Sequence, residues 1–184
     1  GGFDNRRKSL LPCLICAAPE VADLNQDGFL DLVVTNKYDP DPKTDKPLAY
    51  GGDPDTTSYI YWGGPKGLSP DRRQKLPAVG GQDAAVDDLN GDGHLDLVIS
   101  SYHAGYTRKH PSYIYWNSSE GFGPKRVTMI PTHSSSGAML ADFNQDGHKD
   151  IFFANHSKDG NHRNDSFLYW GSPEGYSPDR RSGI

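Results

Sequence analysis

The segment "ADLNQDGFLDLVV" at residues 22–34 places acidic and amide side chains at alternate positions around a glycine, and then continues into apolar, β-branched residues. Two other segments repeat this pattern, "DLNGDGHLDLVI" at 88–99 and "DFNQDGHKDIFF" at 142–153. The apolar part of each copy favours a buried strand. The chain is therefore built from a repeated unit in which a carboxylate-rich turn leads into a buried strand.

A second motif repeats in the same order. It is "SYIYW" at 58–62 and 112–116 and "SFLYW" at 166–170, and Trp62, Trp116 and Trp170 are evenly spaced at 54 residues. The first unit carries an insertion at 37–57 that is rich in Pro, Asp and Gly, which indicates a loop. Three related units therefore make up nearly the whole chain.

Each unit is expected to form four short strands: one before the acidic turn, one after it, the "SYIYW" strand, and one near "RRQKLP" or its equivalent. In "SYIYW" both alternating faces are large and mostly apolar, so this strand is expected to lie in a sheet between two other sheets. Four-stranded sheets repeated radially form a β-propeller. The sequence thus predicts an all-β propeller domain with repeats near 1–66, 67–120 and 121–174 and a closing segment at 175–184.

The acidic turns have the oxygen pattern that Ca²⁺ requires, with side-chain ligands at positions 1, 3, 5 and 9, a glycine at 6 and a backbone carbonyl at 7. Position 12 is Val34, Ile99 or Phe153 instead of the glutamate of an EF-hand. The same residue types also favour turns without any metal, but three carboxylates within nine residues repel one another. Three Ca²⁺ sites are predicted, and their ligands are Asp23, Asn25, Asp27, Phe29 and Asp31; Asp88, Asn90, Asp92, His94 and Asp96; and Asp142, Asn144, Asp146, His148 and Asp150.

These turns resemble the FG-GAP/VCBS repeat family, the calcium-binding blades of integrin-α-like propellers, through D-x-N-x-D-G-x-x-D followed by a buried strand. The resemblance implies a propeller with Ca²⁺ in its hairpin loops, usually extracellular, that serves adhesion or ligand binding.

Three blades are fewer than the four to eight of closed propellers. We expect two chains to form a six-bladed homodimer through their open blade edges, with the terminal "RR" segments pairing across the junction. The alternative is that the chain is an excised part of a longer propeller.

The connections between the second and third strands differ most among the units and are expected to share one face. Their candidate ligand-binding residues are Tyr50, His103, Tyr106, His110, His156 and His162. No G-x-S-x-G or H-E-x-x-H motif is present. The leading hypothesis is a non-catalytic interaction module for a protein or glycan partner. The alternatives are a lectin-like carbohydrate binder and a fragment of a secreted enzyme such as a polysaccharide lyase or a quinoprotein.

The formal charge of −5 gives no basic footprint for nucleic acid, and no apolar run approaches the length of a membrane span. Extracellular Ca²⁺ modules work at millimolar calcium, so a secreted, cell-surface or periplasmic location is expected. Cys13 and Cys16 form C-x-x-C, which fits a redox site, half a zinc site or a disulfide, but neither a second metal-ligand pair nor a redox context is visible. They are expected to be incidental packing residues.

Overall fold

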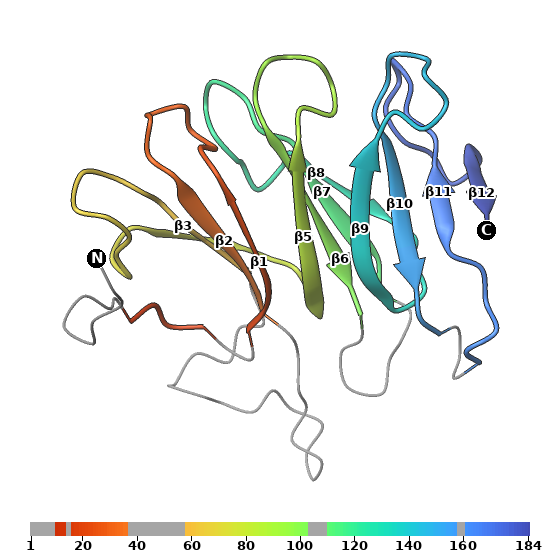
Figure 1. Ribbon diagram of the computed structural model, residues 1–184, viewed down its shortest axis with the longest axis horizontal. Coiled ribbons are helices and arrows are strands. Elements are labelled where there is room, and N and C mark those ends of the chain that lie inside the picture. The colour runs from red at the N-terminus through yellow and green to blue at the C-terminus, as the bar shows by residue number, and fades with distance from the viewer. Residues whose placement is uncertain (1–9, 14–15, 37–57, 103–109, 158–160) are drawn as a thin grey trace, which may run out of the picture.

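The computed structural model describes residues 10–13, 16–36, 58–102, 110–157 and 161–184. Figure 1 shows three four-stranded antiparallel sheets side by side, each in sequential strand order, and the described residues contain no helix. Blade 1 comprises β1 (Cys16–Ala22), β2 (Asp31–Asn36), β3 (Ser58–Tyr61) and β4 (Arg73–Leu76). Blade 2 comprises β5 (Gly81–Asp87), β6 (Asp96–Ser101), β7 (Ser112–Tyr115) and β8 (Val127–Ile130). Blade 3 comprises β9 (Ser135–Ala141), β10 (Asp150–Asn155), β11 (Phe167–Tyr169) and β12 (Arg181–Gly183).

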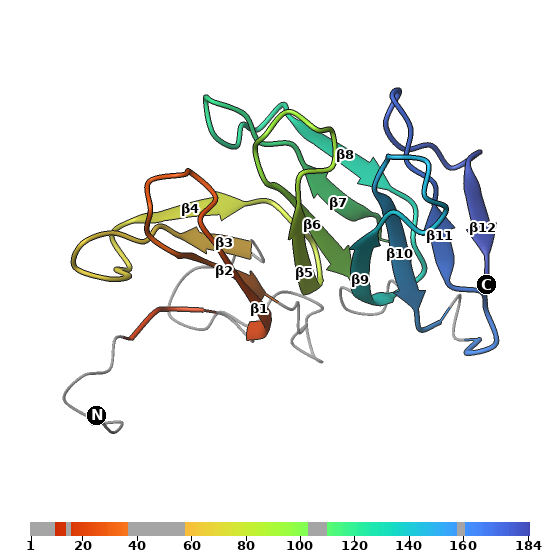
Figure 2. The ribbon, with the colours of Figure 1, turned by 45° about the horizontal axis from the view of Figure 1, so that its top comes forward.

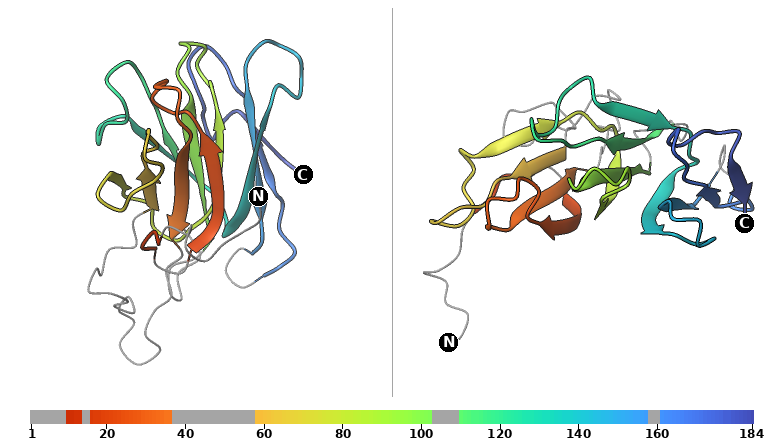
Figure 3. Two further views of the ribbon diagram at one scale, coloured as in Figure 1. Left: turned by 60° about the vertical axis from the view of Figure 1, so that its left-hand side comes forward. Right: turned by 90° about the horizontal axis from the view of Figure 1, so that it is seen from above.

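The predicted all-β fold of four-stranded propeller blades is confirmed, and the first strand of each blade is innermost. Seen from above, the three sheets follow one another in an arc (Figure 3). The inner strand β5 contacts both β1 and β9, so the three inner strands line the concave side of that arc. This order places equivalent loops of all three blades at the same end of the molecule.

The core consists of the two spaces between neighbouring blades. Blade 1 contributes Val33 and Ile60 to a cluster with Leu97, Ile99, Tyr113 and Tyr115 of blade 2. Blade 2 contributes Val98 and Ile114 to a second cluster with Ile151, Phe153, Phe167 and Tyr169 of blade 3. The two faces of the middle blade are therefore buried against different sheets, as the two-sided apolar strands predict.

A strap of chain crosses one face of every blade before its first strand. The phenolic hydroxyl of Tyr169 donates to the carbonyl oxygen of Pro131 over 2.5 Å, and the same bond joins Tyr115 to Pro77 and Tyr61 to Pro12. In blade 1 this strap accompanies a small cluster of Val34, Tyr59 and Tyr61 with Leu11, Leu32 and Leu68. The strap therefore makes the same hydrogen bond to its own blade in all three blades.

The carboxyl-terminal segment does not extend beyond blade 3. Residues Phe167, Leu168 and Tyr169 of β11 pair with Gly183, Ser182 and Arg181 of β12. The prediction that this "RR" segment pairs across a dimer junction is therefore wrong. The arginine is retained in the blade by its neighbours, because the Arg181 guanidinium lies over the Phe167 ring and donates to the Tyr169 hydroxyl.

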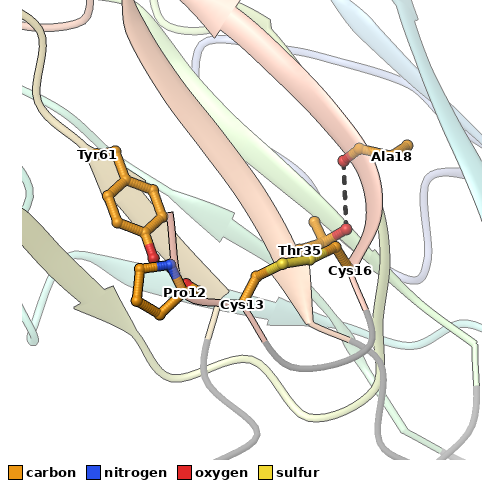
Figure 4. Close-up of a disulfide and its surroundings, with 6 residues drawn as sticks. All are labelled: Pro12, Cys13, Cys16, Ala18, Thr35 and Tyr61. Carbon is orange, nitrogen blue, oxygen red and sulfur yellow. Dashed lines mark hydrogen bonds between the residues drawn. A yellow bond between two sulfur atoms is a disulfide. The ribbon is translucent and has the colours of Figure 1, made fainter. Parts of the chain in front are cut away.

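Cys13 and Cys16 form a disulfide at the entrance to β1 (Figure 4), with their Cα atoms 5.7 Å apart. The expectation that they are incidental packing residues is wrong, because the chain before β1 returns close enough for the two sulfurs to bond. Close to the disulfide, Tyr61 donates to Pro12, and the Thr35 hydroxyl donates to the Ala18 carbonyl over 3.3 Å. The disulfide therefore links the end of the strap, at Cys13, to the first residue of β1, Cys16.

Candidate functional site

The three acidic loops lie together at one end of the molecule. Each connects the first strand of a blade to the second, and Figures 1 and 2 show these hairpin loops projecting at the same end of blades 1, 2 and 3. The tight connection requires a left-handed residue, which Gly28, Gly93 and Gly147 supply at position 6 with φ between 86° and 90°. The repeat therefore presents the same set of oxygen atoms three times.

The carboxylate at position 1 organises each loop by accepting backbone hydrogen bonds. In loop 1, Asp23 accepts from the N–H of Asp27 over 3.1 Å and from the N–H of Gly28 over 2.8 Å. Asp88 and Asp142 do the same in their loops. A carboxylate has about four acceptor sites, so these bonds do not use all of them.

Positions 3 and 5 form a linked pair on the exposed side of the loop. The Asn90 side-chain oxygen accepts from the Asp92 N–H over 2.9 Å, while its amide donates to the Asp92 carboxylate over 3.1 Å. Asp92 in turn accepts from the His94 N–H over 2.9 Å. The other two loops repeat these bonds, so the turn is held by its own Asx side chains.

Position 9 has a different environment, because Asp31, Asp96 and Asp150 are at most 1% exposed. Asp96 accepts from the Leu89 N–H over 3.1 Å and from the Asn117 N–H over 2.8 Å. These two N–H groups belong to the start of the loop and to the segment just after the third strand. Each position-9 aspartate therefore joins its hairpin loop to the segment that follows the third strand of the same blade.

Burial and neighbouring charge act together on these carboxyl groups. Desolvation, opposed by the two backbone hydrogen bonds and reinforced by Asp92 and Asp88, raises the pKa of Asp96 to about 6. The pKa of Asp31 is also raised, mainly by burial and further by Asp27 and Asp23. The negative charges of one loop thus repel one another, and a cation placed among them would relieve that repulsion.

Contacts between blades connect the loops in series. The Gln26 amide donates to the Gly93 carbonyl over 2.6 Å, which links loop 1 to loop 2. The Asn117 amide donates to the Leu24 carbonyl over 2.8 Å and to the Leu95 carbonyl over 3.1 Å. Loop 3 differs from the other two by Lys149, whose ammonium lies 2.8 Å from Asp87 of blade 2.

The donor chemistry of the loops fits Ca²⁺, a hard cation that takes carboxylate, amide and carbonyl oxygens. Among the described residues, no three His, Cys, Asp or Glu side chains are gathered as a ready metal cluster. In each loop all three carboxylates accept bonds from backbone N–H groups, and the remaining predicted donors are an amide and a carbonyl oxygen. The ligand assignments at positions 1, 3, 5, 7 and 9 stay predictions.

Three rings meet at the opposite end of blades 2 and 3. Tyr102 follows β6, and its hydroxyl lies 3.1 Å from Nδ1 of His156, which follows β10. The ring centroids of His156 and His162 are 4.7 Å apart, and those of Tyr102 and His156 are 5.2 Å apart. Both histidines are exposed, and the His156 N–H is anchored on the Ser134 carbonyl. We call Tyr102, His156 and His162 the ring group.

The structure brings together two of the six residues that were predicted for the ligand face, namely His156 and His162. His110 lies before β7, where its carbonyl accepts a hydrogen bond from the Thr132 hydroxyl. Tyr50, His103 and Tyr106 lie outside the described residues. Sequence reasoning missed Tyr102, although it stands 54 residues before His156, the same interval that separates the tryptophans.

Asn117 was also missed. It occupies the position after the tryptophan where blades 1 and 3 have Gly63 and Gly171. The available signal was the constant interval of 21 residues between Asp96 and Asn117 and between Asp150 and Gly171. The residue 21 positions after the buried aspartate is therefore the one whose backbone N–H donates to that aspartate.

Comparison with known proteins finds similar repeats. Residues 88–153 match a family model described as the FG-GAP-like repeat, which runs from the second acidic loop to the strand after the third. The chain is also similar to integrin alpha-IIb of Mus musculus, with 27% identity over 143 residues that cover 71% of this chain and 14% of the integrin. The predicted resemblance to FG-GAP repeats is confirmed, and the chain spans about a seventh of the length of that relative.

No helix in the described ranges has the length and apolar character needed to cross a membrane.

Proposed function

We propose that this FG-GAP-like repeat chain is a non-catalytic, calcium-binding interaction module that acts outside the cell or at its surface. The repeat and the similarity to an integrin α-subunit support a β-propeller interaction module. The observation that carries the calcium assignment is the threefold repetition of one oxygen set, in which self-repelling carboxylates stand beside amide and carbonyl oxygens. Bound Ca²⁺ would neutralise those carboxylates and stiffen the hairpin loops.

Two properties of the chain support the proposed location. The Cys13–Cys16 disulfide fits an oxidising compartment, where such bonds form and persist. Extracellular modules commonly bind Ca²⁺ at about 10⁻⁴ to 10⁻³ M, which matches the calcium available there. A non-catalytic role is supported by the sequence, which contains neither G-x-S-x-G nor H-E-x-x-H.

Calorimetric titration of chelator-treated, dialysed protein with Ca²⁺ tests the proposal. We expect three Ca²⁺ per chain, with dissociation constants of about 10⁻⁴ to 10⁻³ M. Asp27→Asn, Asp92→Asn and Asp146→Asn should each remove one site, because asparagine keeps the oxygen that accepts the backbone bond of position 7 but loses the charge.

The matched control is Asp71→Asn, at an exposed aspartate whose N–H is bonded to the Ser69 hydroxyl in an ordinary turn. This variant should still bind three Ca²⁺. A wild-type chain that takes up no Ca²⁺, or single variants with an unchanged stoichiometry, would reduce the acidic loops to Asx turns without a metal.

The ring group favours a glycan as the second candidate partner. Aromatic and imidazole rings at an exposed position provide both faces for stacking and polar atoms for sugar hydroxyls. On a glycan array, His162→Ala should weaken binding of any positive glycan by about fivefold to tenfold. His148→Ala, at the opposite end of blade 3, should leave it unchanged. Equal behaviour of the two variants, or an array without hits, would contradict this assignment.

A further inference from the structure

Loop 2, at residues 88–96, contains a dipeptide that the other two acidic loops lack. Asn90 at position 3 is followed by Gly91, and the sequence has no other Asn-Gly pair. Both residues are exposed to water. Asparagine is chemically labile, and it is most labile before glycine, because no side chain then hinders attack of the next backbone nitrogen on the side-chain amide.

Loops 1 and 3 have glutamine in place of this glycine, with the same backbone conformation. Gln26 follows Asn25 and Gln145 follows Asn144. Their φ angles are 59° and 60°, and that of Gly91 is 74°, so all three residues are left-handed. Nothing lies within 4 Å of the place that a Cβ on Gly91 would take. Position 4 therefore differs among the loops mainly in its side chain, which makes loops 1 and 3 internal controls for loop 2.

The backbone nitrogen that would attack is hydrogen-bonded to a carboxylate. The Gly91 N–H donates to Oδ1 of Asp88 over 2.8 Å. A carboxylate at this distance can accept the proton as the nitrogen forms its new bond, which is the geometry of a general base. Asp88 thus makes the Gly91 nitrogen a better nucleophile.

The side-chain amide that would be attacked is held at both of its polar atoms. Oδ1 of Asn90 accepts from the Asp92 N–H over 2.9 Å, and Nδ2 of Asn90 donates to the Asp92 carboxylate over 3.1 Å. The first bond forms an Asx turn, which folds the asparagine side chain back along its own following peptide. An N–H directed at the amide oxygen also stabilises the negative charge that develops there during attack.

We propose that Asn90 is a deamidation site and that the folded loop 2 promotes the reaction. The Gly91 nitrogen bonds to Cγ of Asn90, the bond from Cγ to Nδ2 breaks, and ammonia leaves with the proton that the Gly91 nitrogen loses. Water then opens the cyclic imide and leaves aspartate or isoaspartate at position 90. The net reaction consumes water and releases ammonia, and it needs no other reactant.

The product has a carboxylate where loop 2 had an amide. The hydrogen bond from Nδ2 of Asn90 to the Asp92 carboxylate is lost, and a further negative charge joins those of Asp88, Asp92 and Asp96. The reaction therefore makes the oxygen set of loop 2 more acidic than those of loops 1 and 3. This inference goes beyond the proposed function, and it requires no bound calcium.

Peptide mass spectrometry of the folded chain measures the reaction directly. Chelator-treated protein is incubated at mildly alkaline pH in water labelled with heavy oxygen, which enters the side chain when the imide opens. We expect Asn90 to lose its amide at least about tenfold faster than Asn25 or Asn144. Equal rates at the three asparagines, or no reaction at Asn90, would overturn the proposal.

A pair of variants exchanges the residue at position 4 between loops. Gly91→Gln should slow the reaction at Asn90 about tenfold or more, and Gln145→Gly should accelerate it at Asn144 by a similar factor. Both positions are exposed, and glycine and glutamine occur at equivalent positions with similar φ, so the blades should stay folded. Circular dichroism checks this. An unchanged rate at Asn90 in Gly91→Gln contradicts attack by the Gly91 nitrogen.

A third variant, Asp88→Asn, tests whether the loop promotes the reaction. Asparagine keeps an oxygen that accepts the Gly91 N–H but loses the charge, so deamidation at Asn90 should slow about 10²-fold. Asp71→Asn, in the exposed turn that contains Ser69, should react like the wild type. If Asp88→Asn reacts as fast as the wild type, or if the chain unfolded in urea loses the Asn90 amide faster than the folded chain, loop 2 does not promote the reaction and the proposal is wrong.

Discussion

Replacing Asp96 by alanine in chelator-treated protein will lower the free energy of unfolding by roughly 2–4 kcal/mol. Asp96 is fully buried, and its removal leaves the N–H groups of Leu89 and Asn117 without their acceptor. Each buried unsatisfied donor costs about 1–3 kcal/mol. The raised pKa of Asp96 shows that burial of the charge already costs stability, so part of the loss is returned when the carboxylate is deleted.

The control variant for this experiment is Asp92→Ala in the same loop. Asp92 lies on the exposed side and bonds only within the loop, so its loss should cost less than about 1 kcal/mol without calcium. Urea unfolding at pH 7 of both variants and of Asp96→Asn, which keeps one acceptor, provides the measurement. Equal destabilisation by the Asp92 and Asp96 variants would contradict a structural role for position 9.

The blade pattern could be predicted from the sequence because it depends on local periodicity repeated three times. Alternation in "SYIYW" determines that Ile60 and Tyr61 lie on opposite faces of their sheet, and the structure places them in different clusters. The role of Asp96 could not be predicted in full, because a sequence does not show whether a carboxylate oxygen meets a metal or a backbone N–H. Those N–H groups come from residues as distant as Asn117, and only the folded blade brings them together.

Two other differences between the sequence predictions and the structure also depend on contacts that form only in the folded chain. Cys13 and Cys16 are too close in sequence for spacing alone to decide between a disulfide and a metal ligand pair, and the path of the chain before β1 decides it. The "RR" segment at the carboxyl end resembles the connectors that follow Trp62, and pairing of Tyr169 with Arg181 identifies it as the fourth strand of its own blade. The repeating unit of the sequence begins at a different point from the four-stranded blade. The sequence alone therefore does not show which blade this segment joins.

Adding 10 mM Ca²⁺ to the chelator-treated chain should raise its melting temperature by about 15 to 30 °C. A site occupied at about 100 times its dissociation constant stabilises the folded state by about 2.7 kcal/mol, and a domain of this size gains about 2–4 °C per kcal/mol. Three loops with the same oxygen set contribute together. Differential scanning calorimetry of the wild type in Ca²⁺, in Mg²⁺ and in chelator measures the effect, and Mg²⁺ should give a much smaller shift because it retains its waters.

The triple variant Asp27→Asn, Asp92→Asn and Asp146→Asn separates calcium from the fold itself. Each asparagine keeps the acceptor for the N–H of position 7, and each change sacrifices one exposed amide–carboxylate bond. The variant should therefore melt within a few degrees of the chelated wild type and gain almost nothing from Ca²⁺. If it gains as much as the wild type, position 5 does not bind the cation. If neither protein responds, the self-repelling carboxylates are stabilised by the backbone N–H groups alone, and the aspartate-rich turns are needed for the geometry of the blade rather than for metal.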